Sequence, residues 1–302
     1  MKSQRAARMQ ISTAQFLLWL CLFSAGFTST LWGQSHADEE QLHAAYAGKV
    51  VTLRHFYSDA HLEFAADGTL KGTSTVGPWT LDGQLLVNDV QLREGKLRVH
   101  GRRLHLYYDS SSKDFRDYLT VIENLPEPER QKLQDEEKSL LEFAVEIDID
   151  LPSTPLDWPT LANAMNAVFR APGESMTSIV PEYWRVYFAR KEGRPQEMPR
   201  LSAAKIEVVK PGGPVTPPVV TFHPDPSYEE QARKSKYQGT SVVRMVVAED
   251  GSVRDLQILT PLGLGLDEKA VDAVKTWKFE PARRGDQPVA VIIAVEVTFK
   301  LY

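Results

Sequence analysis

Histidines and paired acidic residues are the side chains of this sequence with the greatest capacity for chemistry, because imidazole and carboxylate groups ligate metals and transfer protons. Among the seven histidines, the close pairs are His55 with His61 and His100 with His105. Neither pair has a further ligand at metal-binding spacing, so we expect exposed or core histidines and no metal site. Asp148 and Asp150 alternate with apolar residues, which is more typical of a strand than of a catalytic pair.

Enzymatic motifs are missing from the sequence. It contains no G-x-S-x-G, no H-E-x-x-H and no phosphate-binding glycine loop. Its one cysteine, Cys21, excludes a disulfide framework and a cysteine-rich metal site. The net charge of −5 argues against a nucleic-acid partner. We expect a protein that is not an enzyme and has no cofactor; a secreted enzyme with its site in residues 45–200 is the less favoured alternative.

The backbone of the last strand is the strongest candidate for a binding site. Residues 289–302 alternate two apolar-rich faces, and the chain ends there. If this strand lies at a sheet edge, its N–H and C=O groups form a template for an extended peptide. The residues predicted to pair with that peptide are Val291, Ile292, Ile293, Ala294, Val295, Glu296, Val297, Thr298 and Phe299.

The elements that must position this strand can be read from residue 219 onward. A helix is expected after Ser227, capped by Ser227 and Glu230. Strands are expected over Thr240–Ala248 and Val253–Thr260, joined by an Asp250-Gly251 turn, and a second helix over Asp267–Lys278. This order predicts an α+β domain in which two helices cover one face of a three-stranded antiparallel sheet.

This C-terminal pattern resembles the C-terminal domain of TonB-family energy transducers. Besides the closing apolar strand, the residues that carry the resemblance are Tyr228, Ala232, Gly239, Asp250, Gly251, Trp277, Phe279 and Pro281. The resemblance implies a periplasmic domain that grips a short peptide of an outer-membrane TonB-dependent receptor beside the closing strand. It also implies coupling to an ExbB/ExbD-type motor if the N-terminal helix is retained. Whether the protein forms a homodimer is left open.

Three features depart from the family pattern. The Tyr-Pro pair of the family is Tyr228-Glu229 here, and the transmembrane Ser-x-x-x-His motif is absent. The long spacer of the family is replaced by other sequence. A non-energised periplasmic scaffold or interaction protein with a TonB-like fold is therefore the alternative function.

Residues 1–37 form a targeting segment. Lys2, Arg5 and Arg8 precede the apolar run Phe16–Phe27, and acidic residues follow, which places the N-terminus in the cytoplasm and exports the rest. Ser35-His36-Ala37 fits a signal cleavage site. We favour a cleaved signal peptide over a retained inner-membrane anchor, and a periplasmic location in either case.

Two further segments separate the targeting segment from the C-terminal domain. Within residues 38–125, short runs of alternating apolar and polar residues are separated by the turn sequences Asp67-Gly68, Asp82-Gly83, Glu94-Gly95 and His100-Gly101. This pattern predicts an all-β meander or small barrel of unknown role. Residues 126–218 read as a helical, proline-rich connector, with helices expected over Pro128–Ala144 and Trp158–Phe169. Its end, Pro211–Pro218, reads as a semi-rigid linker.

Overall fold

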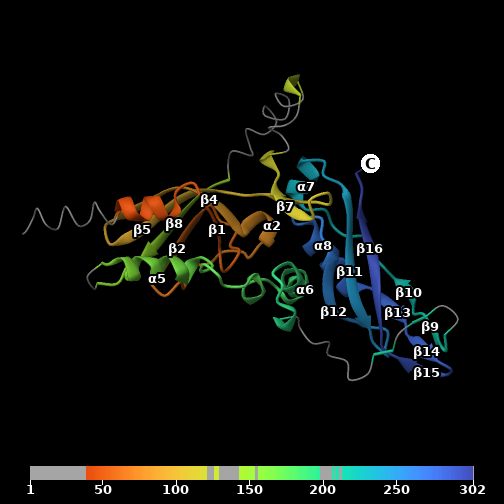
Figure 1. Ribbon diagram of the computed structural model, residues 1–302. Coiled ribbons are helices and arrows are strands. Elements are labelled where there is room, and N and C mark those ends of the chain that lie inside the picture. The colour runs from red at the N-terminus through yellow and green to blue at the C-terminus, as the bar shows by residue number, and fades with distance from the viewer. Residues whose placement is uncertain are drawn as a thin grey trace, which may run out of the picture.

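The computed structural model describes residues 39–120, 126–128, 143–153, 156–197, 206–207, 209–210 and 213–301, and Figure 1 shows their arrangement. The predicted targeting segment and most of the helix expected over Pro128–Ala144 lie outside these residues. The described chain is a mixed α and β structure with several sheets. An N-terminal sheet and its helices lie beside a C-terminal sheet and its helices.

A six-stranded sheet forms the N-terminal unit. Its order is β1 (Val50–Thr52), β4 (Gln84–Arg93), β5 (Lys96–Arg103), β8 (Ala144–Asp150), β2 (His61–Phe64) and β3 (Leu70–Lys71). Neighbouring strands are antiparallel except β2 and β8, which are parallel. The expected meander or barrel within residues 38–125 was therefore wrong.

Strand β8 is the reason for this difference. It lies between β5 and β2 although it follows them by many residues, and parallel pairing needs such a crossover connection. Val145, Ile147 and Ile149 are buried on one face of β8, so this strand supplies part of the core. The sheet thus extends into the stretch that was predicted to be a connector.

The glycine pairs of the N-terminal unit have different roles. Asp67-Gly68 joins β2 to β3, and Glu94-Gly95 joins β4 to β5 with a positive φ at both residues, as a tight hairpin requires. His100-Gly101 instead lies within β5, where a Cβ on Gly101 would come within 2.8 Å of the Leu86 carbonyl oxygen. Asp82-Gly83 ends the short helix α2 (Trp79–Asp82).

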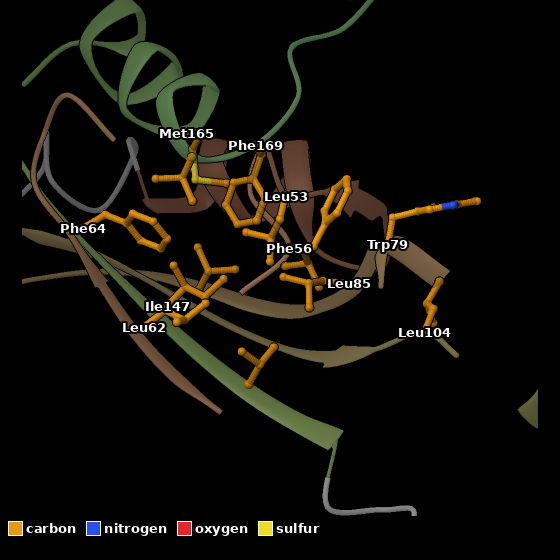
Figure 2. Close-up of a cluster of buried hydrophobic side chains, with 14 of the residues drawn as sticks. Leu53, Phe56, Leu62, Phe64, Trp79, Leu85, Leu104, Ile147, Met165 and Phe169 are labelled. Atoms are coloured by element: carbon orange, nitrogen blue, oxygen red, sulfur yellow. The ribbon is translucent and has the colours of Figure 1, made fainter. Parts of the chain in front are cut away.

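The N-terminal core lies between the sheet and helix α5 (Trp158–Val168), as Figure 2 shows. The helix begins as its sequence predicts, with Asp157 accepting a hydrogen bond from Thr160 N at 2.9 Å. Met165 points from α5 toward Phe169, Leu53 and the sheet. A second helix, α6 (Glu182–Lys191), buries Trp184 completely. The aromatic segment of the predicted connector is thus part of the folded structure.

The C-terminal unit has the predicted three-stranded antiparallel sheet. Its order is β12 (Val253–Thr260), β11 (Gly239–Val247) and β16 (Val291–Phe299). Helix α8 (Leu266–Thr276) packs on it through Leu266, Ala270 and Val274, which are fully buried.

The remaining elements of the described chain, in both units, are β6 (Leu106–Asp109), β7 (Asp114–Asp117), η2 (Met176–Ser178), η3 (Pro195–Glu197), β9 (Val215–Thr216), β10 (Val219–Phe222), α7 (Glu230–Lys234), β13 (Lys278–Glu280), β14 (Ala282–Arg284), β15 (Gln287–Val289) and a helix over residues 39–46.

Two local predictions in this unit need correction. Helix α7 is capped by Glu229 and not by Ser227, because Tyr228 is held outside the helix by a hydrogen bond from its hydroxyl to Tyr237 O at 2.5 Å. The expected linker Pro211–Pro218 contains β9, which pairs with β14 and buries Val215. The ordered C-terminal unit thus includes residues before the predicted boundary at residue 219.

Candidate functional site

Strand β16 lies at the edge of the C-terminal sheet. Each of its residues, from Val291 to Phe299, pairs with β11 in one uninterrupted antiparallel register. Strand β12 is on the far side of β11, and α6 packs against β12. The chain itself therefore occupies the β12 side of the sheet, whereas β16 ends the sheet on the other side.

The backbone direction of β16 follows from one contact. Glu207 N donates a hydrogen bond to Ala290 O at 2.9 Å, so the carbonyl of Ala290 points away from β11. In an extended strand the N–H and C=O of one residue point to the same side, and successive residues alternate. Ile292, Ala294, Glu296 and Thr298 thus direct their N–H and C=O groups toward the open side.

The side chains of β16 divide between two faces. Val291, Val297 and Phe299 are buried in the C-terminal core, as the sequence alternation predicts. Ala294, Glu296 and Thr298 are exposed on the opposite face. Strand β16 is therefore anchored by one set of side chains, while among the described residues its other face and most of its open side stay accessible.

A surface hollow of about 310 Å³ lies beside the C-terminal end of β16. It is lined by Asp225, Pro226, Tyr228, Thr298, Phe299 and Lys300. The Tyr228 ring meets the Phe299 ring edge-on, with centroids 5.5 Å apart, so the segment before α7 is fixed against β16. One acidic and one basic side chain, Asp225 and Lys300, thus lie beside the C-terminal end of β16.

The other motif residues build the domain rather than the open side. Trp277 packs on the core and its indole N–H donates to Pro224 O at 3.3 Å. Phe279 and Ala232 are buried, and Pro281 separates β13 from β14. Gly239 begins β11. None of these residues lies on β16, so their contacts support the fold of the domain.

The Asp250-Gly251 turn also has a structural role. Asp250 Oδ1 accepts hydrogen bonds from Ser252 N and Oγ. Gly251 has a φ of +78° and a Cβ there would fall 1.9 Å from Phe279 O. The turn between β11 and β12 therefore requires glycine for both its conformation and its contact with β13.

Glu207 is a residue of the site that sequence reasoning missed. Its backbone forms a parallel bridge with Val291, and its side chain accepts a hydrogen bond from Arg284 Nη2 at 2.5 Å. No sequence pattern indicates this contact, because it joins segments far apart in the chain. Glu207 occupies the beginning of the open side, up to the N–H of Ile292, and leaves the stretch from Ala294 onward as the exposed part among the described residues.

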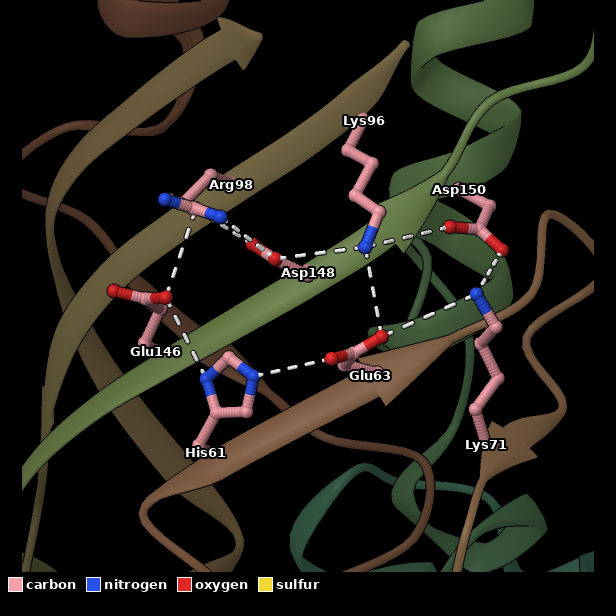
Figure 3. Close-up of polar contacts among 8 residues, drawn as sticks. All are labelled: His61, Glu63, Lys71, Lys96, Arg98, Glu146, Asp148 and Asp150. Carbon is pink, nitrogen blue, oxygen red and sulfur yellow. Dashed lines mark hydrogen bonds and ion pairs between the residues drawn. The ribbon is translucent and has the colours of Figure 1, made fainter. Parts of the chain in front are cut away.

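A second polar cluster lies on the outer face of the N-terminal sheet (Figure 3). The histidine pairs expected from spacing are not brought together: His61 and His100 instead both face Glu146, with Nδ1–O distances of 3.5 and 3.4 Å. His105 is buried, and burial lowers its pKa to about 3. The side-chain ligand atoms of His61, Glu146 and Asp148 all lie within 4.8 Å of one another.

The cationic neighbours decide how this cluster is interpreted. Arg98 Nε and Nη2 donate to the two carboxylate oxygens of Asp148 at 2.8 and 2.9 Å, and Lys96 lies 3.9 Å from the same group. A carboxylate already paired in this bidentate way is a poor metal ligand. We therefore interpret the cluster as cross-strand ion pairs that hold β2, β5 and β8 in register.

Comparison with known proteins finds relatives of the C-terminal unit. Residues 224–301 match the family of the Gram-negative bacterial TonB protein C-terminal. Protein tonB2 of Pseudomonas aeruginosa is 38% identical over 80 residues, which are 26% of this chain and 30% of that protein. Protein TonB of Vibrio cholerae is 34% identical over 86 residues, or 28% of this chain and 35% of that protein.

A solved structure is also similar to part of the chain. The solution NMR structure of the Pseudomonas aeruginosa TonB CTD has 18% identity, covers 33% of this chain and 99% of its own, and has a TM-score of 0.24. By sequence, residues 224–301 are similar to the C-terminal domain of TonB proteins, which are energy transducers and not enzymes. The matched stretch spans about a third of the length of the two curated relatives.

Membrane-spanning segments were sought among the helices of the described residues. None of these helices combines the length and apolar character that crossing a bilayer requires. The targeting segment proposed from the sequence is not among the residues searched.

Proposed function

We propose that this protein acts in the periplasm as a TonB-family protein that binds a peptide of an outer-membrane TonB-dependent receptor. The peptide adds as a further strand to the open side of β16, beyond Glu207, and pairs with Ala294, Glu296 and Thr298. The single observation that carries the proposal is the position of β16, which ends the sheet while its outward N–H and C=O groups face away from β11.

The expected contact is weak and reversible. A neutral backbone hydrogen bond contributes only about 1 kcal/mol net, and the outward residues of β16 offer a small number of them. Ala294 and Thr298 present short side chains, so they leave room for a neighbouring strand. Specificity would come from the peptide side chain that reaches the hollow between Asp225 and Lys300.

Energy transduction is the finer part of the proposal. TonB-family membership supports a role in receptor-linked transport, and coupling to an ExbB/ExbD-type motor requires that the N-terminal apolar segment stays in the inner membrane. N-terminal sequencing of the protein from the cell envelope tests this point. An intact Met1 region supports a coupled transducer, whereas a mature chain that begins at Asp38 contradicts it.

A scaffold without a motor is the second candidate. It is favoured by the packing of the N-terminal sheet unit directly on the TonB-family domain, where a long spacer would be expected in a transducer. Peptide binding to β16 is common to both candidates, so only the state of the N-terminus separates them.

Hydrogen exchange tests the shared binding mode. Synthetic peptides copying the periplasmic N-terminal segments of the TonB-dependent receptors of the same organism are added to the full-length protein, and amide exchange is followed by mass spectrometry. Strand addition predicts slower exchange in residues 291–299. Protection elsewhere, with residues 291–299 unchanged, would contradict the proposed site.

A further inference from the structure

The N-terminal unit and the TonB-family domain are joined through their backbones. Leu264 N donates to Leu106 O at 2.7 Å, and Tyr108 N donates to Leu262 O at 2.9 Å. These two hydrogen bonds, here called the backbone clamp, connect β6 with the loop that leads into α8. Between these two hydrogen bonds, Tyr107 and Gly263 form an antiparallel β-bridge. The loop is therefore paired in the manner of a short strand with the N-terminal unit.

Glycine permits this close approach. Gly263 has a φ of +91°, and a Cβ there would lie 2.5 Å from Leu106 O. Gly265 N donates to Thr80 Oγ1 at 3.0 Å across the same interface. The apolar cores also continue across it, since Leu81 packs in the C-terminal core and Val271 in the N-terminal core. The docking surface is thus shaped for the chain's own N-terminal unit.

An acidic side chain that is half-buried lies within this interface. Trp184 Nε1, from α6, donates to Glu268 Oε1, from α8, at 2.8 Å. Glu268 Oε2 is shielded from solvent and has no hydrogen-bond partner among the described residues. The groups that act on this carboxyl are Trp184, Asp267 and Asp272, and Tyr183 faces it from α6. The two charged groups among them are acidic residues of α8, so their charges oppose ionisation of Glu268, whereas the hydrogen bond from Trp184 favours it.

We propose that the interface between α6 and α8 is a proton-sensitive docking face, at which a protonated Glu268 holds the N-terminal unit on the TonB-family domain. Ionisation of Glu268 places an unpaired charge in the contact and favours separation at the backbone clamp. The open side of β16 lies across the sheet from the β12 side that α6 covers. The docking face is thus distinct from the proposed peptide site and does not depend on it.

The sign of the pH dependence follows from burial. Burial raises the pKa of Glu268 from 4.5 to about 8, with the Asp267 charge adding to the effect. The docked state then binds a proton that the separated state releases, so docking is strongest below pH 4.5 and weakens as pH rises through 8. One proton changes the docking equilibrium by at most about tenfold per pH unit between these limits.

Hydrogen exchange at the backbone clamp measures this equilibrium. The full-length protein is compared with Glu268→Gln at pH 6 and pH 7.5, after correction for intrinsic exchange, in peptides containing Tyr108 and Leu264. In the wild type we expect protection to fall by about tenfold per pH unit. The Gln side chain keeps the oxygen that accepts a hydrogen bond from Trp184 but carries no charge. This variant should therefore lose the pH dependence that Glu268 causes and retain only the part that titration of Asp267 causes in both proteins.

Two controls keep the test decisive. Asp272→Asn removes an exposed carboxylate of α8 that makes the smallest of the contributions to the raised pKa of Glu268, so this variant should keep most of the wild-type pH dependence. Gly263→Val should open the clamp at both pH values, because the new side chain collides with Leu106 O. Equal pH dependence in the wild type and Glu268→Gln would overturn the proposal.

A direct titration covers the case in which Glu268→Gln does not fold. The carboxyl ¹³C shift of Glu268 is followed in the wild-type protein with selectively labelled glutamate. A midpoint above pH 7 supports the docking face. A midpoint near the ordinary value of 4.5 contradicts it.

Discussion

Glu207 donates its backbone N–H to the carbonyl oxygen of Ala290 at 2.9 Å, and so places one residue of an earlier segment beside the start of β16. The Arg284 side chain holds the Glu207 carboxylate at 2.5 Å, which fixes this contact. The open side of β16 therefore already accepts a parallel neighbour at Val291. The proposed receptor peptide would continue the pairing that Glu207 begins.

The β11–β12 turn gives a stability prediction. Gly251→Ala should lower the free energy of unfolding by about 3 kcal/mol, because the methyl group meets Phe279 O and the residue keeps a positive φ. Gly285→Ala is the matched control: its φ is +59°, but a Cβ there has no neighbour within 4 Å, so about 1 kcal/mol is expected. Urea unfolding measures both. Equal losses would show that the contact with Phe279 has no energetic role.

Asp267 organises the loop of the backbone clamp. Its carboxylate is fully buried and accepts hydrogen bonds from Ser241 Oγ at 2.7 Å, Leu262 N at 2.9 Å and Gly263 N at 2.7 Å. Asp267→Asn puts an amide donor where one of these donors now points, and should cost about 2 kcal/mol of stability. Thermal unfolding compared with Asp272→Asn, which alters an exposed carboxylate of the same helix, checks this. A variant as stable as the wild type would contradict the assigned role.

The ion pairs on the N-terminal sheet predict an acid effect. The Arg98 guanidinium holds the pKa of Asp148 below its ordinary value of 3.8, so the stabilisation is present above that value and is lost as pH falls through the lower one. Asp148→Asn should cost about 1–3 kcal/mol at pH 7 and much less at pH 2.5. Asp150→Asn, on the more exposed end of β8, should change stability by less than about 1 kcal/mol at either pH. Urea unfolding at the two pH values tests the pair, and a constant Asp148→Asn effect would refute the assignment.

Sequence reasoning predicted the local features of the C-terminal unit. Asp250-Gly251 specifies its hairpin because glycine readily adopts the positive φ that this turn requires. The alternation from Val291 to Phe299 gave the buried face of β16, since side chains on a strand alternate with period two. Both signals are contained in a few consecutive residues.

Long-range contacts could not be read in the same way. Strand β8 inserts between β5 and β2, and alternation identifies a strand without naming its partners. The composition of β16 is equally compatible with a central or an edge position, so only the sheet order decides it. The Trp184–Glu268 hydrogen bond joins two helices that the sequence assigned to separate domains.

Peptide binding to variants with a single substitution on the open side of β16 tests the central claim most directly. Ala294→Pro removes an outward N–H while leaving the pairing with β11 possible, since proline is tolerated on edge strands when its nitrogen faces outward. Ala294→Val is the matched control, because it changes the same exposed side chain and keeps that N–H. Calorimetric titration of each variant with the receptor peptide that binds the wild type should show at least about fivefold weaker binding for Ala294→Pro, equivalent to one lost hydrogen bond, and little change for Ala294→Val. Equal affinity of both folded variants for the peptide would contradict strand addition at β16.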